Sequence, residues 1–336
     1  MTNLIGIDIG GTKCSVILGG TTSKESGTPT SKYTDDFFIS EKIVFPTPIN
    51  DPNATIKLIL VTIKQLLEQH NLGINQVQAV GISCGGPLDS QNGIILSPPN
   101  LPGWNDIRIS DIMEKELGIR PVLQNDANAC AIAELKWGAG RGLQNFVFLT
   151  FGTGMGAGLI VNGALYSGTN DMAGEIGHIR MEDGGPVGYG KAGSFEGFCS
   201  GGGIAQLGRM KVLEQIQLGR SVAFCPDINA VQSISAKTIG EFAEKGDPLA
   251  QEIFHISGVY LGRGIAILID ILNPEAIIIG SIFIHQKELL LPSALEVIKK
   301  EALSVSSNRC KILPAGLGDK LGDAAALGIA AYSLEV

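Results

Sequence analysis

Two glycine-rich turns are the first groups in the sequence that could do chemistry. One is GGTK at residues 10–13, and the other is GTGMGAG at 152–158. Each follows a short apolar run and leads into another, which is the pattern of a strand, a tight turn and a second strand. Consecutive backbone N–H groups in such turns can surround an anion, so two turns could hold a polyphosphate. The alternative is that each is a tight hairpin without a ligand.

Asp8 makes the first turn more specific, because a carboxylate beside a phosphate is costly unless a cation lies between them. Oxygen ligands of this kind suit Mg²⁺, so we expect Asp8 to bind that ion. Neither turn has a common nucleotide signature. GGTK fails the GxxxxGK[ST] pattern of a P-loop, and both turns lead into strand-like segments rather than the helix that follows GxGxxG. The sequence therefore argues against an NAD-dependent oxidoreductase.

Alternating strand and helix patterns supply the frame that must position these turns. Strands are predicted at 4–9, 14–18, 77–83, 121–123, 146–151, 159–161 and 276–279, and helices at 54–70, 107–117, 125–137, 238–243, 250–272, 289–303 and 323–334. Residues 19–36 are predicted to form a solvated loop and 182–203 an irregular functional loop. This alternation predicts an α/β fold, and turns about 140 residues apart indicate two similar halves.

Composition excludes several classes of protein. The chain has 336 residues, 44% of them hydrophobic and 6% aromatic, and a net charge of −8. These values exclude a mainly disordered chain and argue against a broad nucleic-acid surface or a base-stacking platform. The apolar stretch 265–284 contains polar residues, so it predicts a buried helix and strand rather than a membrane span. Six scattered cysteines and the lack of a basic leader predict reduced thiols and a cytoplasmic protein.

Eight segments in order along nearly the whole chain resemble the ROK family (repressors, open reading frames and sugar kinases). They are GIDIGGTK at 6–13, CGGPLD at 84–89, PNLPGW at 99–104, QNDANACA at 124–131, TFGTGMGAGLI at 150–160, AGEIGH at 173–178, NPEAIIIGS at 273–281 and LGDAAALGIA at 321–330. The resemblance implies a two-lobed, actin-like and hexokinase-like (RNase H-like) ATPase fold with a central cleft. It implies an N-terminal lobe at 1–122 plus 318–336 and a C-terminal lobe at 123–317.

The resemblance also implies a role for each motif residue. Asp126 would be the general base that takes a proton from a sugar hydroxyl. Sugar hydroxyls would be bound by Asn100, Asn125, Glu175, His178 and Glu196. The ATP site would comprise Gly10, Gly11, Thr12, Lys13, Gly152, Thr153, Gly154 and Gly280, with Asp8 organising Mg²⁺. Taken alone, Asn125 or Asp126 could simply cap the helix that follows, and Asn100 could simply form a turn.

One segment departs from the family pattern. Members usually place a zinc ion between the AGEIGH histidine and three cysteines, and the matching positions here hold Val187, Tyr189 and Ser194. Valine cannot bind zinc, and tyrosine and serine are poor ligands beside a single histidine. We therefore expect no structural zinc and a loop at 182–197 that is ordered by packing and hydrogen bonds.

The activity implied by the resemblance is ATP-dependent phosphorylation of a hexose or N-acetylhexosamine, with glucose as the foremost acceptor. It also implies a homodimer, although no segment identifies the interface, and we expect no nucleic-acid or membrane partner. Two alternatives stay open: a sugar-responsive transcriptional regulator of the same family, and a sugar-binding protein without catalysis. The regulators carry a helix-turn-helix before the kinase-like body, whereas the first strand here starts at Leu4.

Overall fold

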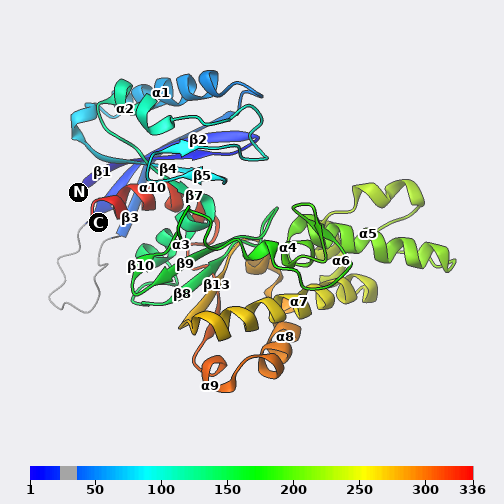
Figure 1. The fold of residues 1–336 in the computed structure, drawn as a ribbon. Coiled ribbons are helices and arrows are strands. Elements are labelled where there is room, and N and C mark those ends of the chain that lie inside the picture. Colours follow the sequence, from blue (N-terminus) through cyan, green and yellow to red (C-terminus); the bar gives the residue numbers. More distant parts are fainter. Residues whose placement is uncertain (23–35, 336) are drawn as a thin grey trace. The chain divides into compact units, whose positions relative to one another are not determined.

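The structure of the chain is a computed structural model that describes residues 1–22 and 36–335 (Figure 1). Most of the solvated loop expected at 19–36 lies outside the described residues. The chain divides into two compact units. Unit 1 comprises Met1–Gln144, Gly158–Ala173 and Gly316–Val336, and unit 2 comprises Asn145–Ala157 and Gly174–Ala315. The lobes implied by the family resemblance divide the chain differently at 123–144 and 158–173, and they remain an expectation.

A five-stranded mixed sheet forms the frame of unit 1. Its order is β3-β2-β1-β4-β7. The strands are β1 Thr2–Ile9, β2 Lys13–Thr22, β3 Asp36–Pro46, β4 Val77–Cys84 and β7 Val122–Asn125. β1 runs antiparallel to β2 and parallel to β4, and β4 runs parallel to β7. The carboxyl ends of β1, β4 and β7 therefore lie at one edge of the sheet.

The second five-stranded sheet has the order β10-β9-β8-β13-β14. Its strands are β8 Phe146–Leu149, β9 Ala157–Val161, β10 Ala164–Leu165, β13 Ala276–Ile279 and β14 Lys311–Pro314. Within unit 2, β13 pairs in parallel with both β8 and β14. All four residues of β13 are fully buried, which explains why this strand is a continuous apolar run.

Helices and short elements complete the chain. The helices are α1 Pro52–Gln69, α2 Ile109–Leu117, α3 Asp126–Trp137, α4 Phe195–Phe198, α5 Gly201–Gln217, α6 Ala236–Glu244, α7 Pro248–Leu272, α8 Ile282–Glu301, α9 Ser304–Ser307 and α10 Leu321–Ser333. Two small hairpins are β5 Leu88–Asp89 with β6 Ile94–Ile95, and β11 Val187–Gly188 with β12 Lys191–Ala192. Short 3-10 helices are η1 Ile74–Gln76, η2 Ile176–His178, η3 Ile228–Ser233 and η4 Gly318–Lys320.

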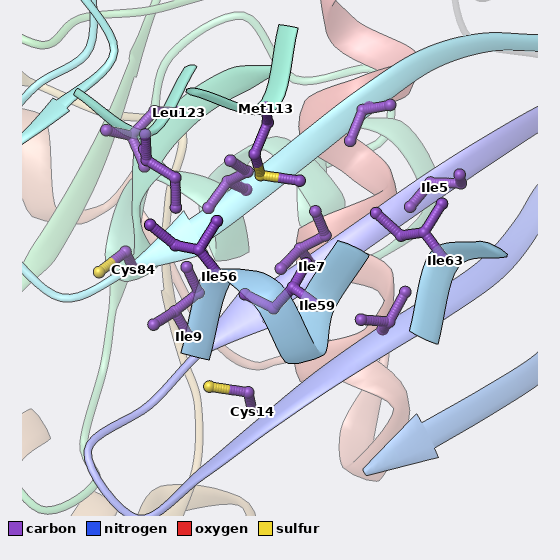
Figure 2. Packing of buried hydrophobic residues seen from close by; sticks show 14 of the residues in the cluster. Ile5, Ile7, Ile9, Cys14, Ile56, Ile59, Ile63, Cys84, Met113 and Leu123 are labelled. Carbon is purple, nitrogen blue, oxygen red and sulfur yellow. The ribbon is translucent and has the colours of Figure 1, made fainter. Parts of the chain in front are cut away.

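The core of unit 1 follows from the alternation of side chains along β1. Ile5, Ile7 and Ile9 belong to one buried cluster with the apolar face of α1, which includes Ile56 and Ile59 (Figure 2). Each of these side chains is at most 3% exposed. Burying an isoleucine contributes about 1.5–3 kcal/mol, so this cluster fixes the strand that carries Asp8.

The opposite face of the sheet is covered by α10. Leu4 in β1 shares a second buried cluster with Leu327 of this helix. Two glycines allow the close approach: a Cβ at Gly6 would lie 2.8 Å from the backbone nitrogen of Leu327, and one at Gly81 would lie 2.6 Å from the backbone oxygen of Ala326. Small residues at these two positions therefore hold α10 against β1 and β4.

The apolar segment near the end of unit 2 is a core element. Among the described residues, α7 alone has the length and composition of a membrane span, but half of its most apolar window is buried in the fold. α7 packs along α8 and α6. The prediction of a buried helix followed by a buried strand at 265–284 is confirmed by α7 and β13.

Several local predictions were wrong. Residues 19–22 belong to β2 rather than to a loop, and α1 is capped by Asp51 instead of Asn53, with Pro52 at its first position. Residues 182–203 contain the hairpin β11–β12, the short helix α4 and the start of α5. β3, β14 and α5 were not predicted at all.

Candidate functional site

The carboxyl edge of the sheet in unit 1 brings several of the predicted site residues together. In register, Ile9 of β1 is opposite Cys84 of β4, and Cys84 is opposite Asn125 of β7. Asp8 therefore lies near the end of the first of these strands, and Asp126 directly follows the last. This placement follows from parallel pairing of three short apolar strands.

Asn125 and Asp126 form the start of α3. Asn125 is the N-cap residue, and its Oδ1 accepts a hydrogen bond from the Ala127 N–H at 2.9 Å. Asp126 is the first helical residue, and its Oδ1 accepts from the same N–H at 2.8 Å. The helix start therefore orients both side chains. Of the two capping alternatives, the structure makes Asn125 the cap, and Asp126 follows as an exposed first helical residue.

Both carboxyl groups have a raised pKa. Burial raises the pKa of Asp8 to about 6, and repulsion from Asp126 adds to the rise, while Lys42 and Lys13 oppose it. Solvent reaches Asp126, yet the protein that surrounds it desolvates the carboxyl and raises its pKa, and hydrogen bonds from nearby backbone N–H groups oppose the rise. A pair of neighbouring carboxyl groups with raised pKa values is typical of a functional site.

Asn100 also lies at this edge. A Cβ at Gly11 would lie 2.3 Å from the Asn100 backbone oxygen, so the loop that carries Asn100 touches the first glycine turn. A Cβ at Gly85 would lie 3.3 Å from Asn100 Oδ1, and one at Gly86 would lie 3.2 Å from Asn125 Nδ2. The CGGPLD segment therefore passes beside both asparagine side chains.

The first glycine turn is tightly closed. The Gly10 N–H donates to the Lys13 backbone oxygen at 3.1 Å, and the Thr47 hydroxyl donates to the Gly10 backbone oxygen at 2.6 Å. The Gly10 N–H is thus used within the turn, although the sequence predicts it in the ATP site. Thr12 and Lys13 are exposed at its tip.

The second glycine turn lies in unit 2 and is closed by backbone hydrogen bonds of its own. The Thr150 N–H donates to the Gly156 backbone oxygen at 3.0 Å, and the Gly152 N–H donates to the Gly154 backbone oxygen at 3.2 Å. Thr153 is exposed. The hydrogen-bond pattern differs from that of the first turn, because the paired residues are three apart there and six and two apart here. The internal repeat stays a prediction.

Glu196 contacts this second turn. Its Oε2 accepts a hydrogen bond from the Met155 N–H at 3.0 Å. A Cβ at Gly177 would lie 3.3 Å from the Glu196 Cβ, so η2 packs against the same residue. Glu175 and His178 bracket η2, and both are exposed. Three predicted sugar-binding residues thus belong to one local assembly in unit 2.

A cavity of about 800 Å³ opens beside the second turn within unit 2. Its volume is in the range of small-molecule sites. Gly152 and Thr153 line one side, and the cavity also includes Gly201, Gly202, Arg209, Ile234, Ser235, Lys237, Ser281, Ile282, His285 and Gln286. Gly280 directly precedes Ser281, one of the residues that line the cavity. The Gly280 N–H donates to the Leu149 backbone oxygen at 3.0 Å.

Sequence reasoning missed the basic side of this cavity. Arg209 comes from α5 and Lys237 from α6, and the first turn of α5 brings Gly201 and Gly202 to the cavity. The N-terminal end of a helix attracts anions, and Arg209 and Lys237 add to that preference, whereas the Glu241 carboxylate in the same lining opposes it. Ser200, which precedes three glycines, was the one sequence signal that could have predicted the start of this helix. Its hydroxyl oxygen caps α5 by accepting a hydrogen bond from the Gly203 N–H at 3.0 Å.

Within residues 1–22 and 36–335, no three His, Cys, Asp or Glu side chains are arranged to hold a metal ion. Asp8 still fits Mg²⁺ in its chemistry, since it offers carboxylate oxygens and repulsion from Asp126 would be relieved by a cation. The remaining ligands would be phosphate oxygens and water.

Comparison with known proteins places these features in a family. The profile of the ROK family matches residues 4–335. A glucokinase from Halalkalibacterium halodurans is 30% identical over 321 residues, covering 95% of this chain and 92% of that protein. A glucokinase from Thermotoga maritima is 32% identical over 288 residues, covering 85% and 84%. The Escherichia coli DNA-binding transcriptional repressor Mlc is 26% identical, covering 79% of this chain and 63% of the repressor.

Solved structures give the same result. A ROK family glucokinase from Streptomyces griseus in complex with glucose and AMPPNP has a TM-score of 0.73 and 29% identity, covering 98% of this chain and 99% of that one. A ROK family transcriptional regulator, a homologue of the Escherichia coli Mlc protein, has a TM-score of 0.79 and 25% identity, covering 97% and 77%. A ROK hexokinase from Thermus thermophilus, with a TM-score of 0.74, 24% identity and coverage of 99% of both chains, shares the fold. The α/β fold is thus the actin-like ATPase fold.

Proposed function

The chain belongs to the ROK family, and we propose that it is a cytoplasmic sugar kinase that transfers the γ-phosphate of ATP to a hexose or N-acetylhexosamine hydroxyl. Glucose is the first acceptor to test, because the two glucokinases above are 30% and 32% identical to this chain over most of its length. The observation that carries the proposal is the meeting of Asp8, Asn125 and Asp126 at one sheet edge beside the first glycine turn.

Asp126 is the proposed general base. Its carboxylate accepts the proton of the sugar hydroxyl while that oxygen forms a bond to the γ-phosphorus and the bond from phosphorus to the departing ADP oxygen breaks. The proton then passes from Asp126 to solvent. A raised pKa makes Asp126 a stronger base than an ordinary aspartate, and a positioned base contributes about 10²–10⁴-fold to the rate.

Orientation of the two substrates is the other task of the protein. Asn100, Asn125, Glu175, His178 and Glu196 are proposed to bind sugar hydroxyls. Lys13, Thr12 and Thr153 are proposed to contact phosphate oxygens, and the cavity beside Gly280 to take the adenosine portion. Mg²⁺ on Asp8 would neutralise phosphate charge.

A transcriptional regulator is the second candidate, because the regulator structure reported above has a TM-score of 0.79 with this chain. Its DNA binding would be detected by a shift of labelled DNA, with and without sugar. A sugar-binding protein without catalysis is the third. Sugar binding without sugar-dependent ADP release would identify it.

The test is ADP release with glucose, N-acetylglucosamine, N-acetylmannosamine, fructose and allose, each assayed with ATP and Mg²⁺. We expect at least one sugar to stimulate ADP release far above the rate with ATP alone. A rate with every sugar equal to the sugar-free rate would contradict the proposal. Light scattering of the same sample tests the expected homodimer.

A further inference from the structure

The loop between η2 and α4 is where this chain departs from the family. The residues at the zinc-ligand positions do not fit a zinc ion. Val187 has no donor atom, and Ser194 is fully buried with its hydroxyl already engaged: it accepts from the Gly197 N–H at 3.1 Å and donates to the Gly188 backbone oxygen at 3.3 Å. Of the four positions, only His178 offers a nitrogen or sulfur ligand, and tetrahedral structural zinc requires four good donors.

Two residues of the β11–β12 hairpin contact His178. The ammonium group of Lys191 donates to the His178 backbone oxygen at 2.6 Å. The ring of Tyr189 meets the His178 ring edge-on, with centroids 5.9 Å apart and planes at 76°. The β11–β12 hairpin, in which Gly188 pairs with Lys191, therefore reaches both the backbone and the side chain of His178.

The far side of the hairpin is held by α5. The Val187 N–H donates to Gln206 Oε1 at 3.0 Å, and Gln206 Nε2 donates to the Val187 backbone oxygen at 2.8 Å. This paired geometry resembles one step of a β-ladder. It anchors the hairpin to a helix that also lines the cavity beside Thr153.

A third anchor joins the loop to α7. Arg263 donates to Glu182 Oε1 at 2.6 Å, and the Tyr260 hydroxyl donates to the same oxygen at 3.1 Å. The Tyr260 ring stacks on Phe198 of α4, with centroids 3.5 Å apart. Protein groups thus contact the loop at both ends and at its middle.

The hairpin also sets the place of Glu196. A Cβ at Gly188 would lie 2.7 Å from the Glu196 Cβ and 2.6 Å from the Gly197 nitrogen, so the hairpin backbone lies directly on α4. A displaced hairpin would therefore move Glu196 and His178 together.

We propose that Tyr189 and Lys191 are positioning residues that take over the role of a structural metal ion, holding His178 and Glu196 in the geometry that binds the sugar. The proposal concerns the sugar side of the reaction only, and it rests on the proposed function for its kinetic consequence. The structural part of the proposal is that residues 181–193 stay ordered without a bound metal ion.

The first experiment treats the wild-type protein with a zinc chelator, removes the chelator, and supplies Mg²⁺ for assay. We expect less than stoichiometric zinc by mass spectrometry before treatment, and unchanged melting temperature, sugar KM and amide exchange over 181–193 afterwards. One zinc per chain, together with faster exchange of this loop after chelation, would overturn the proposal.

The second experiment compares K191M and Y189A with the conservative variants K191R and Y189F. Removal of a residue that orients a metal ligand lowers metal affinity or activity about 10–100-fold, and by the same reasoning we expect the sugar KM of K191M and Y189A to rise about tenfold or more. The ATP KM should stay within about twofold, and K191R and Y189F should recover most of the sugar affinity. K299M, at an exposed position of α8, is the matched control and should behave as wild type.

Amide exchange separates failure of this proposal from failure of the proposed function. In K191M and Y189A, exchange should become faster at residues 176–193 and stay unchanged in α7. If the wild type turns over no sugar, the amide exchange rates still show whether Tyr189 and Lys191 order the loop. Unchanged exchange and unchanged sugar KM in both variants would refute a positioning role.

Discussion

At the scale of single residues, the account depends on how two carboxyl groups share one sheet edge. Burial within the protein raises the pKa of Asp8 to about 6, and repulsion from the nearby Asp126 adds to the rise. Asp126 is fixed by the start of α3 and remains open to solvent. One carboxyl group is thus suited to bind a cation and the other to accept a proton.

The Asp8 pKa predicts a pH dependence of Mg²⁺ activation. Protonated Asp8 cannot bind the ion, and with a pKa of about 6 its ionised fraction falls about tenfold between pH 7 and pH 5. The Mg²⁺ concentration for half-maximal activity should therefore rise by about that factor. Kinetic titration of Mg²⁺ at several pH values measures it, and a half-maximal concentration that is constant from pH 7 to pH 5 would remove Asp8 from the metal site.

The same shift predicts the sign of a stability effect. Because the folded-state pKa of Asp8 lies above its ordinary value of 3.8, Asp8 stabilises the fold at low pH, and this contribution is lost as pH rises through about 6. Without Mg²⁺, D8N should therefore melt at a higher temperature than wild type at pH 7.5, and the difference should shrink toward pH 4. A D8N variant that melts lower at pH 7.5 would contradict the assigned environment.

At the scale of elements, the frame of unit 1 depends on close contact between α10 and the sheet. A Cβ at Gly81 would meet the Ala326 backbone oxygen at 2.6 Å, where no flexible side chain can yield. We expect G81A to lower the free energy of unfolding by about 1–3 kcal/mol, the usual cost of overpacking. Urea denaturation measures this change.

The control for the G81A prediction is G322A in α10, where an added Cβ meets nothing within 4 Å. Alanine is favoured over glycine in a helix by about 1 kcal/mol, so G322A should be neutral or stabilising. Equal stability losses in G81A and G322A would show that the α10 contact is not the cause.

Glu134 of α3 is a second test at this scale. Its buried carboxyl group accepts three backbone N–H hydrogen bonds: from Ala139 at 2.6 Å, Gly316 at 3.0 Å and Leu317 at 3.1 Å. E134A would leave these donors without their partner, and one unsatisfied buried group alone costs about 1–3 kcal/mol. Thermal unfolding of E134A should reveal a large loss, whereas E114A, at an exposed position, should change little.

The elements also show what the sequence could predict. Strands on either side of each glycine turn were predictable, because short apolar runs and glycines are local signals. α5 was missed because it begins with three glycines and lacks a clear apolar face, and β3 because it is an edge strand whose residues are only partly buried. Arg209 and Lys237 were missed as cavity residues because packing of α5 near α6 brings them there.

At the scale of the whole molecule, the predicted site residues are distributed over both units. Asp8, Asn100, Asn125 and Asp126 belong to unit 1, and Glu175, His178 and Glu196 to unit 2. Their order along the chain was enough to indicate the ROK family, since the profile of that family matches residues 4–335. Their roles cannot be read from order alone, because this chain is similar both to a glucokinase and to a transcriptional repressor.

The central claim, that Asp126 is the base of a sugar kinase, is tested most directly by the turnover of D126N. With the sugar that the wild type accepts, we expect kcat to fall by about 10²–10⁴-fold. Sugar and nucleotide dissociation constants from calorimetry should stay within about threefold, since Asn125 still caps α3. Near-normal turnover by D126N would contradict the account.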